Sequence, residues 1–223
     1  MEEINKFKVY KARVGRKTLY YTKSAYHGFR GFSESIVKIK GEEYREVFPE
    51  RSKFIAAIAK GLSQTGIKEG SVVLYLGASH GYTPSFMSDI VGKSGFIFAL
   101  DFAPRVVRDL VFVCEERTNM TPLLEDASHP ENYRDLVFDV DVVFQDVAQR
   151  NQLQIFLDNC DMFLKQGGFG LLALKARSVD VTRKPKDIFR EVRAELEKKM
   201  TVVDYRELAP FEKDHAFFIV KKR

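Results

Sequence analysis

Apolar and polar positions follow a β-type pattern in the first fifty residues of the chain. Turn-like segments, VGR and HGFRGFSES, separate three short runs rich in β-branched and aromatic residues, which are FKVYKA, TLYYTKS and SIVKIK. Runs of this composition between turn residues are typical of antiparallel strands. The pattern therefore predicts a small antiparallel β domain over residues 1–50.

A helical pattern replaces the β pattern just after Pro49. The apolar positions now recur at intervals of one, three and four, at Phe54, Ile55, Ile58, Ala59 and Leu62. This spacing is the stripe of an amphipathic helix, which we expect to begin at Arg51 and to end near Gly66. The same change of pattern places the start of a second domain, 51–223, at this helix.

From Ser71 onward, strand-like runs alternate with helical segments. The runs are VVLYL, FIFAL, MTPLL, VDVVF and FGLLALK, and helices are expected at 84–91, 104–117, 131–137, 149–165 and 185–199. Strands joined by crossover helices form a parallel sheet covered on both faces. The final runs, TVVDYRELA and HAFFIVKK, are joined by PFEKD, which is too short for a crossover and predicts an antiparallel hairpin. This order is similar to that of class I S-adenosylmethionine methyltransferases, so we expect an α/β, Rossmann-like fold with a seven-stranded mixed sheet.

The composition narrows the class of protein. Hydrophobic residues make up 45% of the chain and charged residues 30%, the balance of a soluble globular protein. No apolar tract approaches the roughly 20 residues of a membrane span, and MEEINKFKVYK does not resemble a signal peptide. We therefore expect a cytoplasmic protein without a membrane segment. Cys114 and Cys160 fall in helical apolar patterns without metal-site spacing, so we expect reduced core thiols and no metal site.

The positive charge is concentrated at the start of the chain. Residues 1–50 carry 11 Lys and Arg against 7 Asp and Glu, a net charge of +4, whereas the remaining residues carry 25 against 24. A basic surface of this size modestly favours a polyanionic partner. A solvated basic surface without a nucleic-acid role is an equally good interpretation.

A glycine-rich turn follows the first strand of the predicted parallel sheet. The turn reads GASHGYT and holds Gly77, Ala78, Tyr82 and Thr83. Ligands of open α/β sheets lie beyond the carboxyl ends of the strands, where glycine lets the backbone approach a cofactor. Such a turn could serve a nicotinamide, a flavin, S-adenosylmethionine or no ligand. Its GxxxG spacing differs from the dinucleotide fingerprint GxGxxG, which disfavours an oxidoreductase.

Acidic residues end the second and third strands. Asp101 could accept hydrogen bonds from a ribose diol, and Phe102 beside it could pack on an adenine ring. The third strand ends at Asp126 and Ala127, where a carboxylate could receive the adenine amino group. Asp101 could instead cap the following helix. Because these features share one edge of the predicted sheet, together they favour an adenosine cofactor.

The fourth and fifth strands end in further polar residues. FQDVAQ contains Asp146 and Gln149, and Lys175 ends the apolar run FGLLALK. Lys175 is expected near Asp146 at the carboxyl edge, either as a reactive group or as a salt-bridge partner. His215 opens the last strand and Lys53 begins the helix after Pro49. Taken singly, a histidine or a lysine at such a position is equally compatible with an ordinary surface residue.

The ordered set of motifs resembles the fibrillarin family in its archaeal form. Essentially the whole chain takes part, through GEEYREV, LGASHGYT, SDIVG, PRVVRDL, DVDVVFQDVAQ, KARSVDVT and FEKDHAFFIV. The resemblance implies an enzyme that transfers a methyl group from S-adenosyl-L-methionine to ribose 2′-hydroxyls of rRNA or tRNA. It also implies the partners of a box C/D ribonucleoprotein: a guide RNA paired with target RNA, a Nop-type scaffold protein and a kink-turn-binding ribosomal-type protein.

The resemblance also implies particular site residues. The cofactor-binding set is Gly77, Ala78, Tyr82, Thr83, Asp101, Phe102, Asp126, Ala127 and the segment from Asp146 to Gln149. The catalytic set is similar to the Lys-Asp-Lys-Glu tetrad of other ribose methyltransferases, with histidine last, and comprises Lys53, Asp146, Lys175 and His215. This chain departs from the expected pattern at His80 and Tyr82, where serine and threonine are usual.

The reaction leaves two roles open for Lys175. Nearby positive charge would favour loss of its proton, so that it could act as a general base on the ribose hydroxyl. Its expected neighbour Asp146 would favour the charged amine, which would then stabilise the alkoxide electrostatically. Two other functions also fit this fold: a methyltransferase acting on a base, a protein side chain or a small molecule, and a non-catalytic RNA scaffold.

Overall fold

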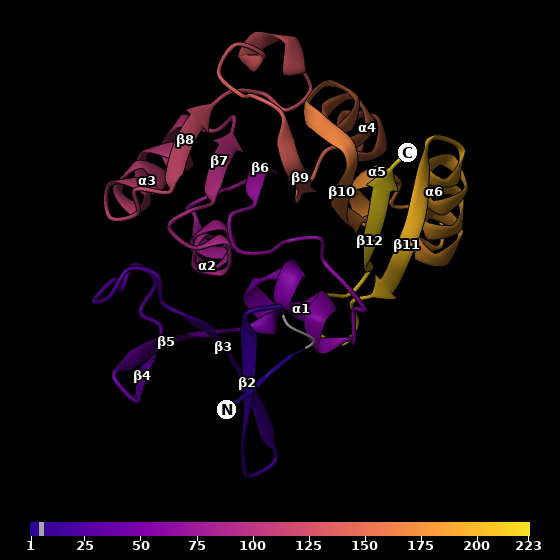
Figure 1. The fold of residues 1–223 in the computed structure, drawn as a ribbon. Coiled ribbons are helices and arrows are strands. Elements are labelled where there is room, and N and C mark those ends of the chain that lie inside the picture. Colours follow the sequence, from indigo (N-terminus) through magenta and orange to yellow (C-terminus); the bar gives the residue numbers. More distant parts are fainter. Residues whose placement is uncertain (5–6) are drawn as a thin grey trace.

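The computed structural model describes residues 1–4 and 7–223, and the first part of the chain forms an antiparallel sheet below the main body in Figure 1. Its strands, in the spatial order β1-β2-β3-β5-β4, are β1 (Glu2–Glu3), β2 (Val9–Val14), β3 (Lys17–Lys23), β5 (Glu42–Val47) and β4 (Ile36–Ile39). Each neighbouring pair is antiparallel. The predicted antiparallel sheet is therefore confirmed, with β1 and β5 as additional strands.

A seven-stranded mixed sheet forms the main body of the molecule. In spatial order its strands are β11 (Met200–Glu207), β12 (His215–Lys222), β10 (Leu164–Lys175), β9 (Val140–Gln145), β6 (Val72–Leu76), β7 (Phe96–Asp101) and β8 (Met120–Leu124). β12 is antiparallel to both of its neighbours, and the other pairs are parallel. The predicted α/β class, the mixed sheet and the final hairpin are confirmed.

Helices connect the strands. Two predicted helices differ from those in the structure, and the short helix at Ala176–Val179 was not predicted. The helices are η1 (Pro49–Arg51), α1 (Lys53–Ala59), α2 (Tyr82–Val91), α3 (Pro104–Glu115), η2 (Pro130–Tyr133), α4 (Gln152–Phe163), α5 (Ala176–Val179) and α6 (Pro185–Lys199). The first helix was expected to reach Gly66, but the left-handed backbone of Gly61 (φ +84°) follows its end. The helix expected at 131–137 is a single 3-10 turn, η2, which ends at Tyr133.

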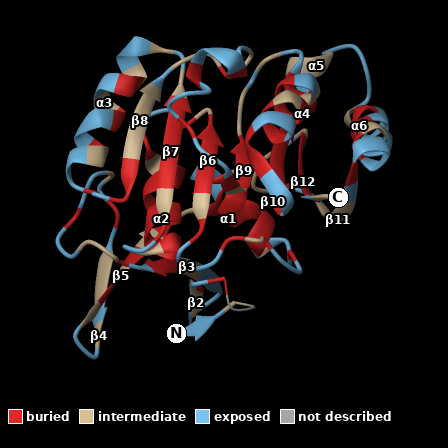
Figure 2. Cartoon of the chain, turned by 45° about the horizontal axis from the view of Figure 1, so that its top comes forward, coloured by how far each residue is buried: buried red, intermediate tan, exposed pale blue. Residues whose placement is uncertain are grey.

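The two faces of the large sheet are covered by different helices. Alternate residues of β6 point to opposite faces, so Val73 and Tyr75 belong to one apolar cluster and Leu74 and Leu76 to another. The first cluster includes residues of α1, α2 and α3, and the second includes residues of α4 and α6. Figure 2 shows the buried strands between helices whose outer surfaces are exposed. The sheet is therefore the middle layer of a three-layer core.

The N-terminal sheet packs on the first of these faces. Val9 of β2 and Val47 of β5 belong to the same apolar cluster as the α1 and α2 residues. A buried ion network strengthens the contact, in which Arg45 Nη1 of β5 lies 2.7 Å from Asp89 Oδ2 of α2. Arg117 Nη2 lies 2.8 Å from the other oxygen of Asp89, and Thr22 Oγ1 of β3 donates to Asp89 at 2.9 Å. The N-terminal strands thus fix α2, which follows the glycine-rich turn.

Two smaller expectations concern the thiols and membrane segments. Cys114 and Cys160 are free thiols, and burial raises the pKa of both. In the part of the chain that the structure describes, every helix is too short or too polar to cross a bilayer.

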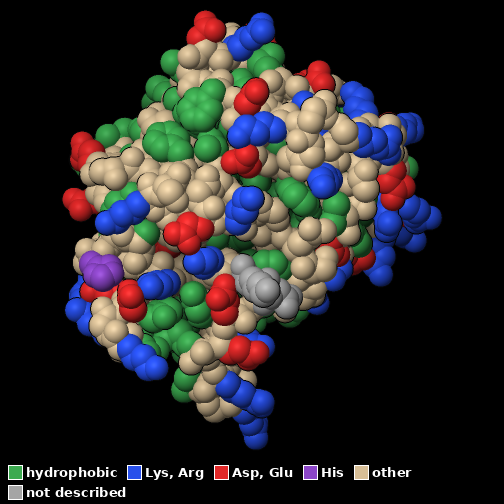
Figure 3. Space-filling model, in the orientation of Figure 1, with side chains coloured by type: hydrophobic (Ala, Val, Ile, Leu, Met, Phe, Trp, Pro, Cys, Tyr) green, Lys and Arg blue, Asp and Glu red, His purple; other side chains and the backbone are tan. Residues whose placement is uncertain are grey.

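Lys and Arg side chains gather at the edge of the molecule formed by α6 (Figure 3), where several pair with acidic residues of the same helix.

Candidate active site

A cavity of about 260 Å³ lies at the carboxyl edge of the parallel strands. The ends of β6, β7 and β9 and the loop after β8 supply its walls, which are Gly77, Ser79, Leu100, Asp101, Phe102, Ala127, Asp146, Val147, Ala148 and Gln149. The sequence places Gly77, Asp101, Phe102, Ala127, Asp146 and Gln149 in the cofactor-binding set, and the fold brings these six residues to one hollow.

Gly77 determines how closely the ends of β6 and β9 approach each other. Its φ is +84°, and a Cβ atom at this position would lie 2.3 Å from the carbonyl oxygen of Asp146. Its backbone N–H and that of Ala78 both donate to the carbonyl of Leu100 at 2.9 Å, which joins the turn to β7. A side chain on Gly77 would push the ends of β6 and β9 apart. Glycine at this position therefore keeps the cavity open to a ligand.

Asp101 and Phe102 have different exposures and contacts. Asp101 Oδ2 accepts from Ser79 N at 2.9 Å, and Oδ1 accepts from Ala103 N at 3.0 Å. A carboxylate has further lone pairs on both oxygens, so it retains capacity for a ligand diol. The alternative of a helix cap at Asp101 is wrong, because Ala103 is the N-cap of α3. The side chain of Phe102 is 63% exposed, which leaves a ring face free to pack on a ligand.

Asp126, an acidic residue after β8, lies outside the wall of the cavity and supports it. Asp126 Oδ1 accepts from Ser128 N at 2.8 Å, and this hydrogen bond lowers the pKa of Asp126. Ser128 Oγ in turn donates to Gln149 Oε1 at 2.9 Å. Asp126 therefore remains a charged acceptor near Ala127 and Gln149, which do line the cavity.

Tyr82 and Thr83 do not line this cavity, and their side chains contact the segment that leads into α1. Tyr82 Oη accepts from Phe48 N at 3.1 Å, and the guanidinium of Arg51 lies 4.0 Å from the centre of the Tyr82 ring. Thr83 Oγ1 donates to Ser52 Oγ at 3.1 Å. The two residues thus connect the start of α2 to the start of α1, directly before Lys53.

The structure joins Lys53 to Asp146 across 93 positions of sequence. Lys53 Nζ lies 3.0 Å from Asp146 Oδ2, and both side chains are 22% exposed. The expected direct ion pair between Asp146 and Lys175 is absent among the described residues. The interpretation of Lys175 as a salt-bridge partner is likewise not supported in the described part of the chain.

Lys175 and His215 lie opposite each other where β10 and β12 pair. His215 is buried, with 8% of its side chain exposed, which excludes an ordinary surface histidine. Its Nδ1 lies 2.7 Å from the carbonyl of Lys213, so Nδ1 carries the proton and Nε2 remains an acceptor. Burial, reinforced by the positive charge of Lys53, lowers the pKa of His215. The imidazole is therefore neutral at pH 7.

Gln152 holds the backbone of Lys175, Gln145 in turn holds Gln152, and neither glutamine was predicted from the sequence. Lys175 N donates to Gln152 Oε1 at 3.0 Å, and Gln152 Nε2 donates to the carbonyl of Lys175 at 3.1 Å. Gln145 Nε2 donates to the carbonyl of Gln152 at 2.7 Å, and both glutamines are fully buried. The only sequence signal was a polar residue, Gln145, at the end of the apolar run VDVVF.

A seven-stranded sheet with one antiparallel strand and a cavity at its carboxyl edge defines the class I methyltransferase fold. The family model described as Fibrillarin matches residues 1–223. The chain belongs to the fibrillarin family.

Similar sequences and solved structures agree with this assignment. The chain is 51% identical over 201 residues to the fibrillarin-like rRNA/tRNA 2′-O-methyltransferase of Thermococcus gammatolerans, covering 90% of this chain and 89% of that one. It is similar to the solved Methanococcus jannaschii fibrillarin pre-rRNA processing protein, with a TM-score of 0.92, 45% identity and coverage of 96% and 94%. Aeropyrum pernix fibrillarin, solved with natively bound S-adenosyl-L-methionine, gives a TM-score of 0.88, 42% identity and coverage of 96% and 94%.

A third solved relative is part of a complex. The structure described as a fibrillarin/Nop5p complex gives a TM-score of 0.85 and 36% identity. The match covers 97% of this chain and 98% of that one.

Proposed function

We propose that this chain transfers a methyl group from S-adenosyl-L-methionine to the ribose 2′-hydroxyl of rRNA or tRNA nucleotides, as the catalytic subunit of a box C/D ribonucleoprotein in the cytoplasm. The observation that carries the proposal is the Lys53–Asp146 pair at the wall of the strand-end cavity, in a chain about half identical to relatives named rRNA/tRNA 2′-O-methyltransferases. Residues 1–50 and 51–223 are its two proposed domains.

The cavity fits the proposed cofactor in shape and chemistry. Gly77 leaves room at the backbone of Asp146, Asp101 offers carboxylate oxygens to a ribose diol, and Phe102 offers an exposed ring to adenine. Gln149 would contact the cofactor directly. The supporting members of the set lie in or beside the same turns and are Ala78, Tyr82, Thr83, Asp126 and Ala127.

The chain's own residues would align and activate the ribose hydroxyl. S-adenosyl-L-methionine supplies a methyl group on a positively charged sulfur, and transfer needs the hydroxyl in line with that bond. Lys53 holds Asp146 by its ion pair, so the carboxylate keeps one orientation at the cavity wall. Lys175 would take the hydroxyl proton or stabilise the alkoxide as a cation. Neutral His215 would accept a hydrogen bond through Nε2 and orient Lys53 or the substrate.

Target choice is assigned to partners, because a net charge of +5 cannot distinguish base sequences. The proposed partners are a guide RNA paired with its target, a Nop-type scaffold protein and a kink-turn-binding protein. The scaffold finds support in the relative solved as a complex with Nop5p. Alone, the chain is expected to methylate RNA poorly.

Single-turnover methylation of a guided RNA by the reconstituted complex tests the proposal. Asp146→Asn and Lys175→Ala should each slow transfer by at least about 100-fold, the usual scale of acid–base or electrostatic assistance. Asp141→Asn and Lys165→Ala are matched controls, because these residues form another Lys–Asp pair at the opposite end of β9 and β10, with Nζ and Oδ1 2.8 Å apart.

The controls should keep near wild-type rates. Mass spectrometry of nuclease-digested product should place the methyl group on the ribose oxygen. A wild-type rate for Asp146→Asn, or a methyl group on a base, would contradict the proposal.

A further inference from the structure

The segment KARSVDVT contains one residue, Lys175, that the proposed reaction uses. The residues after Lys175 form α5 at the carboxyl end of β10, and therefore at the same edge of the sheet as the strand-end cavity. Arg177 is the second residue of α5, and 45% of its side chain is exposed. Arg177 does not line the strand-end cavity, so its guanidinium lies outside the proposed cofactor site.

Hydrogen bonds fix the guanidinium of Arg177 in one orientation. Nε donates to Asp214 Oδ2 at 3.0 Å, and Nη1 donates to the carbonyl of Val181 at 2.8 Å. The carbonyl of Asp214 also accepts from Ala176 N at 3.0 Å. Asp214 makes these contacts from a left-handed backbone (φ +57°), which few residues other than glycine adopt. Asp214 thus ties α5 to the start of β12, directly before His215.

The guanidinium of Arg177 keeps donors for a ligand. Its Nη2 atom has no acceptor among the residues that the structure describes, and Nη1 has a second N–H. Arginine presents its donors as a planar fork that matches the oxygens of a phosphate. Because Asp214 already orients the side chain, little conformational freedom is lost when such a ligand binds.

Lysines without acidic partners lie around Arg177. Lys213 precedes Asp214, and Lys184 and Lys186 lie at the start of α6, which contacts α5. All three lysines are exposed, and none forms an ion pair within the described part of the chain. Their positive charge favours a polyanion at this end of β10 and β12.

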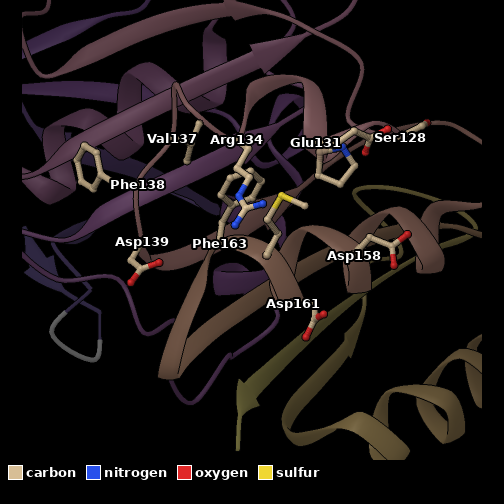
Figure 4. Close-up of a pocket in the computed structure, with 11 residues that line it drawn as sticks. Ser128, Glu131, Arg134, Val137, Phe138, Asp139, Asp158, Asp161 and Phe163 are labelled. Carbon is tan, nitrogen blue, oxygen red and sulfur yellow. The ribbon is translucent and has the colours of Figure 1, made fainter.

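A hollow of opposite charge lies between the connection from β8 to β9 and α4 (Figure 4). Its volume is about 610 Å³, and its walls include Glu131, Asp139, Asp158 and Asp161, with Arg134 as the basic residue among them. Phosphate groups would be repelled by these carboxylates. The RNA backbone is therefore expected on the α5 side of the active site and not at this hollow.

We infer that Arg177 binds an RNA phosphodiester that flanks the target ribose and so holds the reacting hydroxyl in line with the donor's methyl–sulfur bond. The inference rests on the proposed function, because it needs RNA as the methyl acceptor. In RNA, the carbon that carries the 2′-hydroxyl is bonded to the carbon that carries the 3′-phosphodiester, so a group that holds the phosphate also places the hydroxyl. Lys175 acts on the hydroxyl, while Arg177, which follows it on α5, holds the phosphate.

Methylation and target binding by the reconstituted complex test the inference with Arg177→Ala. The single-turnover rate should fall at least about tenfold, because the hydroxyl is no longer held in line. Target binding is measured by fluorescence anisotropy with 2′-deoxyribose at the target nucleotide, which cannot be methylated. The plot of log affinity against log salt concentration should become less steep by about one, since one phosphate contact is lost.

Arg177→Lys separates phosphate binding from a purely structural tie to Asp214. Lysine keeps the positive charge but not the planar fork. This variant should therefore keep the wild-type salt slope and methylate at a rate between those of Arg177→Ala and wild type. Both variants should bind S-adenosyl-L-methionine like wild type, which shows that they are folded. A lower rate with an unchanged salt slope in Arg177→Ala would make Arg177 a structural tie only and would overturn the inference.

Arg193→Ala is the matched control. Arg193 also donates through Nε to a carboxylate, Glu197 Oε1, at 2.8 Å, and its side chain is 53% exposed. Arg193 lies in the second half of α6, which ends where β11 begins at the opposite edge of the sheet. The rate and the salt slope of this variant should match those of wild type.

The possible failures lead to different conclusions. If Arg177→Ala methylates and binds guided RNA as wild type does, the inference is overturned and the proposed function stands. If Arg193→Ala reduces the salt slope as much as Arg177→Ala, the effect belongs to surface charge in general, and the inference is again overturned. A wild-type complex that methylates no guided RNA overturns the proposed function, and the inference with it.

Discussion

At the scale of single residues, Gly77 has the most direct control over the cofactor cavity. Gly77→Ala combines backbone strain at φ +84° with a contact of 2.3 Å to the Asp146 carbonyl. We expect a loss of at least about tenfold in affinity for S-adenosyl-L-methionine, because about 1–2 kcal/mol of strain adds to displacement of the β9 end. Isothermal titration calorimetry measures this affinity.

Gly61→Ala is the matched control for that substitution. Gly61 has the same φ of +84°, and a Cβ atom there would meet nothing within 4 Å. Its replacement should therefore lower stability by the strain alone and leave the affinity unchanged. Equal cofactor affinity in Gly77→Ala and wild type would show that the close approach is not needed for binding.

Gln152 should position Lys175 without contacting the substrate. Replacement by leucine leaves the N–H and carbonyl of Lys175 without the partners that Gln152 supplies, a loss of about 1–3 kcal/mol. We expect kcat to fall roughly tenfold while cofactor affinity changes little. Gln154→Leu, an exposed position of the same helix, should behave like wild type. A fall in cofactor affinity as large as the fall in kcat would contradict a positioning role.

The sequence predicted residue types well but contacts less well. Acidic and basic residues at strand ends were identifiable because parallel strands end at one edge. The partner of Asp146 is Lys53 and not Lys175, and this choice depends on how α1 packs, which local sequence does not encode. Tyr82 departs from the expected threonine because its ring contacts Arg51 and the rings of Phe32 and Phe86.

At the scale of elements, the buried ion network fixes the N-terminal sheet to α2. Asp89→Asn would leave the fully buried Arg45 and Arg117 with Glu34 as the remaining buried carboxylate of the network. Breaking a buried pair typically costs about 3–5 kcal/mol, so we expect this loss in the free energy of unfolding, measured with urea.

The control for Asp89 is an ion pair on the surface of α6. Arg193 Nε lies 2.8 Å from Glu197 Oε1, and both side chains are about half exposed. Glu197→Gln should change the free energy of unfolding by less than about 1 kcal/mol. Equal losses in the two variants would mean that the network contributes no more than a surface pair.

Charged residues at inward positions explain why β5 was not predicted from the sequence. Its inward positions are Glu43, Arg45 and Val47, so charged residues stand where an apolar alternation was sought. The helix predicted over 131–137 is wrong for the opposite reason, because the apolar pattern is present without the α-helix. Apolar residues recur there, but Leu136 and Phe138 remain on the surface while Tyr133 and Val137 point inward.

At the scale of the whole molecule, the fold was predictable because its signals repeat. Five strand runs with intervening helices and one short final connection leave few topologies for a mixed sheet. The attachment of the N-terminal sheet was not predictable, because it depends on long-range packing such as Val9 and Val47 against the α1 and α2 cluster.

That shared packing has a consequence for how the molecule can be divided. One apolar cluster runs from Val9 near the start of the chain to Phe217 in its last strand. A break in the backbone near Pro49 would leave two fragments with complementary apolar surfaces. Neither fragment could bury its apolar surface by itself. The two pieces would have to reassociate to be stable, because each covers apolar surface of the other in the intact molecule.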